Sequence, residues 1–284
     1  MIIDFHTHTF PEKVSSNIVD HLGKVAHIKP FTNGSVGDLR ASMDLAQVNY
    51  SVNLPVMTSP DQVEKINNSM IISNEDWRRH GIISFGGIHP DYEDYKSELR
   101  RLRENHIPGI KLHPAYQNVD LDDIRMMRII DYASEQGLIV LVHAGIDIGI
   151  YDHNYSSVSH ILKVLHEVHP DKLVLAHMGN WGCWDEVEHY LAGAPVWLDT
   201  AFSIGPITPN PNQNEIPYTR ILEEDDFIRL VRKHGTEHVL FGTDSPWKDQ
   251  LDYVDRTQAL PLSDDEKNKI FSENAISLLK KTID

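Results

Sequence analysis

Two histidines stand one residue apart near the start of the chain, in the segment Ile3-Asp-Phe-His6-Thr-His8. Side chains two residues apart on a strand point the same way, about 6.6 Å apart along it. Two neutral imidazole nitrogens placed in this way can converge on one divalent cation. However, 17 of the 284 residues are His, and about one pair with this spacing is expected by chance at that frequency. The metal hypothesis therefore depends on where the other histidines lie in the fold.

Short apolar runs recur along the chain and predict buried strands, because each is too short for a helix and is bounded by polar or turn residues. The eight runs are residues 2–5, 51–54, 82–85, 109–112, 138–142, 172–176, 195–198 and 238–241. The segments between them are long enough for crossover helices, and helices are predicted over 91–105, 120–136 and 158–169. This alternation predicts an α/β fold, a (β/α)8 TIM barrel. A barrel of this kind takes about 250 residues, so residues 1–284 are expected to form a single domain.

In such a barrel the residues that perform chemistry lie at the C-terminal ends of the strands and in the loops that follow them. Seven residues able to bind a metal or move a proton fall at these positions: His6, His8, His89, His113, His143, His177 and Asp244. Imidazole and carboxylate ligands suit Zn²⁺ and are acceptable to Mn²⁺ or Fe²⁺. Residues 203–217, rich in Pro, Gly and Asn, follow the seventh run. They are expected to lie over the barrel mouth, either as a lid or as a loop without function.

The chain resembles the amidohydrolase superfamily, and within it the amidohydrolase-related group that includes enzymes like aminocarboxymuconate semialdehyde decarboxylase. The resemblance covers essentially the full length and rests on motifs that occur in a fixed order. These motifs are Ile3-Asp-Phe-His-Thr-His8, Gly109-Ile-Lys-Leu-His-Pro114, Leu141-Val-His-Ala-Gly145, Val174-Leu-Ala-His-Met-Gly179, Phe241-Gly-Thr-Asp-Ser-Pro-Trp247 and Glu273-Asn-Ala-Ile-Ser-Leu-Leu279.

This resemblance implies a TIM barrel of the metal-dependent hydrolase type. It also implies that His6, His8, His143 and Asp244 bind a divalent metal, Zn²⁺ or another ion such as Mn²⁺, with one ion expected rather than two. It also implies that His177 stands beside the ion as an acid, a base or a group that polarises an oxyanion. Asp244 is expected to move protons as well as to bind the metal. Asp4 is expected to make a supporting hydrogen bond, because metal-binding histidines need their second ring nitrogen held.

Lys111, His113 and His89 are candidates for substrate binding. In many members of the superfamily a lysine at the position of Lys111 is carboxylated and bridges two metals, but a cation there could equally bind a substrate carboxylate. His89 resembles the Gly-x-His-Pro of TatD-type nucleases, although a turn-forming His-Pro explains it as well. His153 could touch the substrate, and Trp181 and Trp184 could wall the pocket. The remaining histidines in predicted helices are expected to be surface or packing residues: His21, His80, His160, His166, His169, His189 and His234.

Hydrolysis and decarboxylation both fit this set of residues. A zinc ion lowers the pKa of the water that it binds to about 7, and the resemblance then favours hydrolysis of a small-molecule amide, ester or lactone. The alternative is a metal-dependent non-oxidative decarboxylase in which Lys111 anchors the carboxylate. A non-catalytic metal-binding barrel is a third interpretation. DNA cleavage is disfavoured because Lys111 stands where an acidic ligand would be expected.

The composition of the chain limits the kinds of molecule that the protein is expected to bind. The formal net charge is −16, with 26 basic and 42 acidic residues, so the surface would repel nucleic acid and anionic lipid. The most apolar segment, residues 137–142, is too short to span a bilayer. A lone cysteine, Cys183, allows no internal disulfide and fits a reducing compartment. A small-molecule substrate and a cytoplasmic location are therefore expected, and the question of a homo-oligomer is left open.

Overall fold

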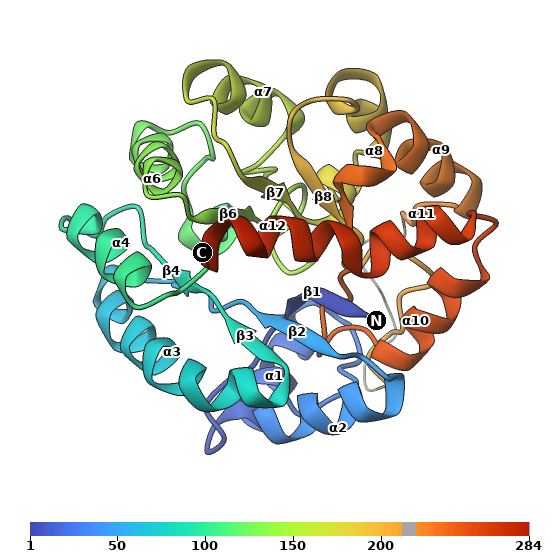
Figure 1. Cartoon of the computed structure of the whole chain (residues 1–284), viewed down its shortest axis with the longest axis horizontal. Coiled ribbons are helices and arrows are strands. Elements are labelled where there is room, and N and C mark those ends of the chain that lie inside the picture. The colour runs from blue at the N-terminus through green and yellow to red at the C-terminus, as the bar shows by residue number, and fades with distance from the viewer. Residues whose placement is uncertain (212–219, 284) are drawn as a thin grey trace.

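The computed structural model describes residues 1–211 and 220–283 of the chain. Parallel strands form the centre of the molecule and helices surround them (Figure 1). The strands are β1 Ile3–Thr7, β2 Tyr50–Asn53, β3 Ile82–Ser84, β4 Gly86–Gly87, β5 Gly109–Leu112, β6 Ile139–Val142, β7 Leu173–Leu175, β8 Trp197–Asp199 and β9 Val239–Leu240. They match the eight predicted runs in position and confirm the (β/α)8 TIM barrel, with one difference in the third run.

The third run, residues 82–85, contains only β3, and a further short strand, β4, follows it after Phe85. β3 pairs with β2 and β4 pairs with β5, while Phe85 stands between them and donates its N–H to the Asn53 carbonyl at 3.0 Å. The other end of the barrel sheet closes where β1 meets the segment around β9. There the Phe5 N–H donates to Phe241 O and the His8 N–H to Ser245 O, both at 2.7 Å. Residues 82–87 therefore form two short strands with different neighbours, β3 beside β2 and β4 beside β5.

Helices follow most strands, as crossover connections between parallel strands require. The α-helices are α1 Ser15–Val25, α2 Val36–Ala46, α3 Val63–Trp77, α4 Tyr95–Glu104, α5 Pro114–Gln117, α6 Ile124–Glu135, α7 Val158–Glu167, α8 Trp184–Glu186, α9 Glu224–His234, α10 Gln250–Ala259, α11 Asp264–Asn268 and α12 Asn274–Ile283. Short 3₁₀ turns are η1 Pro60–Gln62, η2 Arg78–His80, η3 His177–Gly179 and η5 Thr236–His238, and π turns are η4 Val187–Leu191 and η6 Lys269–Glu273.

The three predicted helices correspond to α4, α6 and α7, each a few residues shorter than expected at one or both ends. Capping side chains explain where two of them begin. The Asp123 carboxylate accepts the Arg125 N–H at the start of α6, and the Ser157 hydroxyl accepts the His160 N–H at the start of α7. A cap satisfies a backbone N–H that has no partner within the helix. The acids that precede α6 therefore lie outside the helix.

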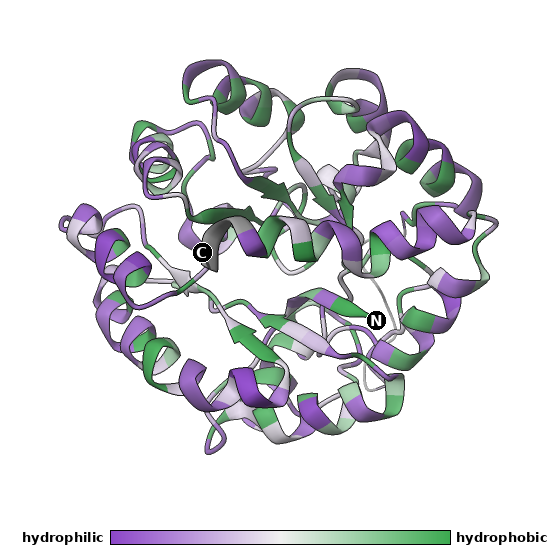
Figure 2. Cartoon of the chain, in the orientation of Figure 1, coloured by the Kyte–Doolittle hydropathy of each residue, from purple (hydrophilic) through white to green (hydrophobic). Residues whose placement is uncertain are grey.

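Apolar side chains fill the barrel interior, and α12 closes one end of it. Figure 1 shows α12 lying across the end of the barrel at which β1 begins, and Figure 2 shows apolar strands inside a ring of helices with polar outer surfaces. The interior cluster joins strand residues such as Phe5, Leu141 and Leu240 to Ala275 and Leu278 of α12. A second, larger cluster lies between the strands and the surrounding helices. The N-terminal end of the barrel is therefore packed, and the site must lie at the other end.

The predicted lid loop, residues 203–217, is described only in part. Residues 212–217 of the expected lid loop lie outside the described residues, and residues 203–211 contain neither helix nor strand. Lys248 holds the start of this loop by donating to the carbonyls of Ile204, Gly205 and Pro206 at 3.3, 3.3 and 2.8 Å.

Among the described helices, none is long and apolar enough to cross a membrane.

Candidate metal centre

The C-terminal end of the barrel gathers the residues at the strand ends. His6 lies in β1, His8 follows it, and Asp244 follows β9. The register of β1 against β2 shifts between Asp4 and Thr7, and irregularities of this kind re-aim side chains beside functional sites. Asp244 and His177 have φ values of 70° and 59°, a left-handed conformation that non-glycine residues rarely adopt. Such strain persists where the surrounding structure imposes it, often at functional sites.

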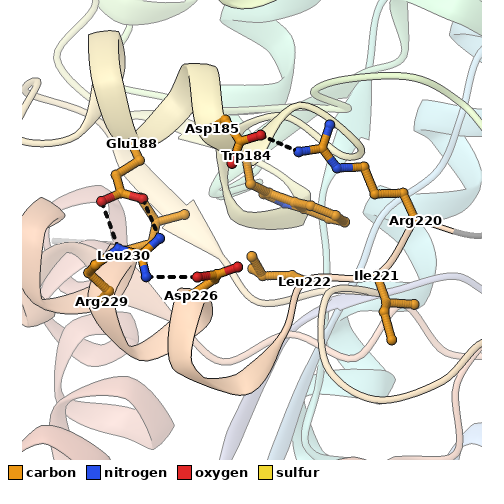
Figure 3. A pocket seen from close by; sticks show the side chains of 9 residues that line it. All are labelled: Trp184, Asp185, Glu188, Arg220, Ile221, Leu222, Asp226, Arg229 and Leu230. Carbon is orange, nitrogen blue, oxygen red and sulfur yellow. Dashed lines mark hydrogen bonds and ion pairs between the residues drawn. The ribbon is translucent and has the colours of Figure 1, made fainter.

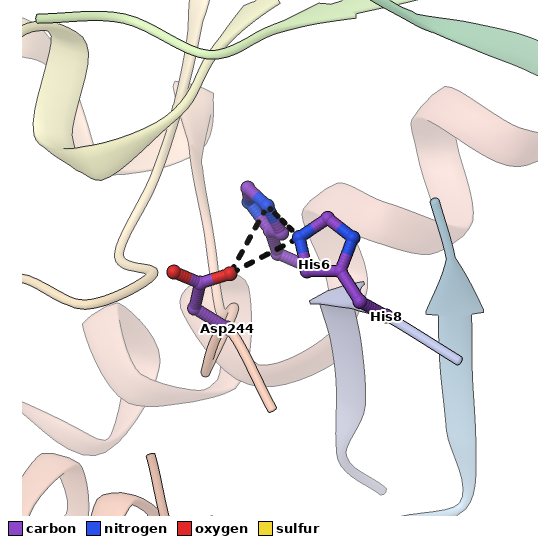
Figure 4. Close-up of side chains that lie close together, drawn as sticks. All are labelled: His6, His8 and Asp244. Atoms are coloured by element: carbon purple, nitrogen blue, oxygen red, sulfur yellow. Dashed lines mark hydrogen bonds and ion pairs between the residues drawn. The ribbon is translucent and has the colours of Figure 1, made fainter. Parts of the chain in front are cut away.

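Three side chains point toward one another in this region, as Figure 4 shows. His6 Nε2 lies 3.2 Å from His8 Nε2, and Asp244 Oδ1 lies 3.5 Å from the first nitrogen and 3.2 Å from the second. All three residues offer a ligand atom within the spacing that one metal ion needs. The structure thus brings together His6, His8 and Asp244, three of the four residues predicted to bind the metal.

Hydrogen bonds on the far side of each ring fix which nitrogen carries the proton. His8 Nδ1 lies 2.7 Å from the Leu54 carbonyl oxygen, which can only accept, so Nδ1 donates. His6 Nδ1 donates in the same way to Asp199 Oδ2 at 2.8 Å. Both Nε2 atoms therefore carry lone pairs, and these lone pairs face a carboxylate oxygen. Three acceptors turned toward one another form an arrangement that a cation would stabilise, and a carboxylate behind a histidine is typical of metal-binding sites.

The charge states of these groups also suit metal binding. Burial, followed by the charge of Lys111, lowers the pKa of His6 well below its usual value. Burial alone would raise the pKa of Asp244, but positive charge on the neighbouring imidazoles, that of His6 first, outweighs burial and holds this pKa below its usual value. A bound cation would supply the same positive charge while the rings stay neutral. His6 is therefore neutral and Asp244 ionised at neutral pH. These are the forms that bind divalent metals.

His143, the fourth predicted ligand, stands apart from the other three. His177 Nδ1 donates to the Ala201 carbonyl at 2.9 Å, so His177 Nε2 carries the lone pair and accepts from His143 Nδ1 at 3.0 Å. His143 Nδ1 is therefore engaged with His177, and no ligand atom of His143 groups with those of His6, His8 and Asp244. Its other nitrogen, Nε2, is buried and has no hydrogen-bond partner among the described residues.

His143 instead belongs to a second group, with His113 and Asp147. Asp147 Oδ2 lies 3.6 Å from His113 Nε2 and 3.9 Å from His143 Nε2, while its Oδ1 accepts the N–H groups of Gly149 and Ile150. The two rings are only 15° from parallel, with centroids 4.1 Å apart. Ring lone pairs lie in the ring plane, so rings stacked in this way do not aim at one ion. The first group is the better metal site.

Lys111 is buried beneath the first group, with 1% of its surface exposed. Its Nζ lies 3.2 Å from His6 Nε2 and donates to that lone pair. Among the described residues, no carboxylate oxygen lies within 4.0 Å of Nζ. Burial lowers the pKa of Lys111 to about 8, against the more distant charges of Asp199, Asp244 and Asp147. Lys111 is thus a largely charged group at neutral pH without an ion-pair partner, which is costly unless a ligand supplies one.

The other predicted site residues lie farther from this centre. His89 is buried, and its Nδ1 accepts the Asp91 N–H at 3.2 Å. His153 is exposed and bonded to Asp120 at 2.6 Å. Trp184 is closer to the site, because its indole N–H donates to the His177 carbonyl at 3.0 Å. Trp181 is buried and packs against Trp184, with ring centroids 6.1 Å apart.

Most of the histidines predicted to be surface or packing residues fit that description. Exposed residues among them are His21, His80, His166, His169 and His189. His234 is buried, accepts the Gly193 N–H at 3.2 Å and donates to Val196 O at 3.0 Å. His160 is partly exposed and groups with Asp120 and Asp122, although these carboxylates already bond to His153 and Lys163.

Asp4 makes supporting hydrogen bonds, as predicted, but two other carboxylates of the region, Asp199 and Asp147, were not predicted. Asp4 does not hold a histidine ring: it accepts the backbone N–H groups of Thr243 and His6 at 2.9 and 3.1 Å. Asp199 holds the ring of His6. Its position directly after the predicted strand 195–198 was a signal that could have identified it. Asp147 lies in a loop, and no comparable signal marks it.

A small cavity on the outside of the barrel is unrelated to this centre. Figure 3 shows it among α8, η4 and α9, beside ion pairs between Arg229 and Glu188 and between Arg220 and Asp185. Its volume is about 60 Å³, room for only a few water molecules. None of its lining residues belongs to the metal group, and the cavity is too small to hold a substrate of this centre.

Comparisons with known proteins relate this geometry to a family and to solved structures. A family model described as Amidohydrolase matches residues 3–281, whereas no curated protein matches the chain. A TIM-barrel protein from Bordetella bronchiseptica is similar over 99% of both chains, with a TM-score of 0.77 and 17% identity. The 5-carboxyvanillate decarboxylase of Sphingomonas paucimobilis is similar over 99% of both chains, with a TM-score of 0.68 and 13% identity. A dihydroxybenzoic acid decarboxylase from Polaromonas with bound manganese is similar over 98% of this chain and 96% of the decarboxylase chain, with a TM-score of 0.71 and 13% identity.

Proposed function

Because the chain belongs to the amidohydrolase family, we propose that it is a metal-dependent enzyme that removes the carboxyl group of a small-molecule substrate. The observation that carries this proposal is the convergence of His6 Nε2, His8 Nε2 and Asp244 Oδ1, which lie 3.2–3.5 Å from one another. The buried ammonium of Lys111 beside them supports a substrate that carries a carboxylate.

One divalent ion would be held by His6, His8 and Asp244. When bound, a Zn²⁺ or Mn²⁺ ion would supply positive charge that holds and polarises substrate oxygen atoms. The manganese bound to the Polaromonas decarboxylase supports Mn²⁺ as the first ion to test. His143 is proposed as a fourth ligand only if its ring moves, since its unpartnered Nε2 lies on the side of Asp147, 3.9 Å from Oδ2.

The residues of the chain can bind the substrate and supply the proton that decarboxylation needs. The bond between the substrate carbon and the carboxyl carbon breaks, CO₂ leaves, and the electron pair stays on the substrate carbon. A proton then replaces CO₂ on that carbon. His177 is the proposed proton carrier: its Nδ1 is fixed on Ala201 O, so its Nε2, which carries a lone pair, first takes up a proton from water and then delivers it to the substrate carbon. Lys111 is proposed to hold the anionic end of the substrate.

Hydrolysis of an amide, ester or lactone is the second candidate, at the same residues. Asp244 supports it, since its lowered pKa leaves an ionised carboxylate that can take a proton from the attacking water. His113 and His89 stay candidates for substrate contact under either reaction. His113 is the nearer of the two to the centre, because its ring stacks on His143.

The deciding experiment measures product gas and acid release from the same reaction. Metal-stripped protein is loaded with Mn²⁺ or Zn²⁺ and given hydroxylated aromatic carboxylates, including 5-carboxyvanillate and 2,6-dihydroxybenzoate, and in parallel a panel of esters and lactones. The proposal expects CO₂ release that stops when the metal is chelated. Acid release from the esters without CO₂ from any carboxylate would favour the hydrolase, and turnover that a chelator does not affect would refute both.

A further inference from the structure

Lys111 uses only one of its three hydrogen-bond donors on a described residue. That contact, 3.2 Å from Nζ to His6 Nε2, is to a neutral imidazole, and the side chain is 1% exposed. Lys248, another buried lysine, differs in this respect, because its Nζ donates to three carbonyl oxygens. A buried ammonium with two unused N–H groups is stable only if something else meets them.

The partner of Lys111 is the nitrogen on which the proposed ion depends. His6 Nε2 has one lone pair, so it cannot both accept from Lys111 and bind a metal. An ion held by His6 would also stand next to a buried positive charge, and charges of like sign repel strongly where water is excluded. Metal binding by itself therefore deprives Lys111 of its hydrogen bond and adds a repulsion.

A carboxylate would remove both penalties. Its two oxygens can accept the free N–H groups of Lys111 and face the ion at the same time, which places negative charge between two positive charges. We propose that Lys111 makes metal binding and carboxylate binding mutually dependent, so that each ligand raises the affinity for the other. The inference rests on the proposed metal centre. Such coupling must be equal in both directions.

The test measures Mn²⁺ affinity by titration calorimetry on metal-stripped full-length protein, with and without benzoate as the carboxylate probe. In the unchanged protein benzoate is expected to tighten Mn²⁺ binding by about tenfold, within the usual range of coupling between sites. In Lys111→Met, Mn²⁺ is expected to bind about tenfold more tightly than in the unchanged protein without benzoate, because the competing ammonium is gone. Benzoate should then have little further effect.

Lys248→Met is the matched control, since it removes a buried lysine that does not touch His6, and it should keep the benzoate effect. Lys111→Gln replaces Lys111→Met if the latter fails to fold, as judged by circular dichroism. An Mn²⁺ affinity that benzoate does not change in the unchanged protein would overturn the inference alone. Weaker Mn²⁺ binding in Lys111→Met would also overturn it, by making Lys111 a ligand. Absence of Mn²⁺ binding in every folded protein would overturn the metal centre and the inference with it.

Discussion

Both ends of the barrel bury side chains, but apolar packing stabilises one end whereas polar and charged groups meet at the other. At the N-terminal end, Phe5 is fully buried against Phe85 and the apolar cluster that α12 completes. At the C-terminal end, His6 and Lys111 are each 1% exposed, yet two ring nitrogens and a carboxylate oxygen converge, and the ammonium has no ion partner among the described residues. Packing explains the first end by itself. The second end makes physical sense only with a ligand, and the two ends should therefore respond differently to substitution.

The largest expected effect is at the metal group. His6→Ala and Asp244→Asn should abolish metal-dependent turnover, a loss of at least about 10³-fold, because a metal supplies several kcal/mol of transition-state stabilisation. The fold should be largely preserved, since residues of the barrel loops are separable from barrel packing. Mass spectrometry measures the metal content of each variant, and unfolding curves show whether its fold is preserved. Full metal retention in both variants would refute the ligand set.

His177→Gln should separate proton transfer from metal binding. Acid–base groups contribute about 10²–10⁴-fold to rates, so turnover should fall by that amount while metal content stays unchanged. The comparison with His6→Ala provides the control, because that variant loses the metal as well. Normal turnover with the ion bound would remove the role assigned to His177.

Phe5→Ala tests the packed end. Truncating a fully buried Phe costs about 3–5 kcal/mol in free energy of unfolding, and Phe5 has no exposed surface. Urea unfolding should show that loss, whereas metal content per folded molecule should be unchanged. A stability loss below about 1 kcal/mol would mean that the apolar end does not hold the barrel together as described.

The smallest expected effect is at the carboxylate behind His6. Asp199→Asn should weaken metal binding by about 10–100-fold, because a carboxylate that orients a ligating histidine contributes that much to metal affinity. Asp147→Asn is the matched control, since it changes a buried carboxylate that lies against the other pair of histidines. A larger loss of metal in Asp147→Asn than in Asp199→Asn would reverse the ranking of the two groups.

The barrel and the positions of its chemical residues follow from local features of the sequence. Short apolar runs mark the strands, and a histidine or aspartate directly after a run marks the end at which chemistry occurs. This reasoning placed His6, His8 and Asp244 together, although 236 positions separate His8 from Asp244 along the chain. The separate strand β4, Gly86–Gly87, was not predicted, because the change of partner from β2 to β5 at this point depends on tertiary pairing.

Proton positions and charge partners could not be predicted from the sequence. That His143 turns toward His177 depends on Ala201 O fixing the proton of His177. The partner that holds His6, Asp199, lies 193 residues away. Lys111 was recognised as a candidate anchor, but its lack of an ion partner is visible only once every neighbouring carboxylate is placed.

The account depends on one ion held by His6, His8 and Asp244. The most direct measurement is a crystal structure of Mn²⁺-loaded protein with anomalous scattering recorded at the manganese edge. The predicted result is a single anomalous peak within about 2.0–2.3 Å of His6 Nε2, His8 Nε2 and an Asp244 carboxylate oxygen. A peak between His113, His143 and Asp147 instead, or none at the barrel mouth, would contradict it.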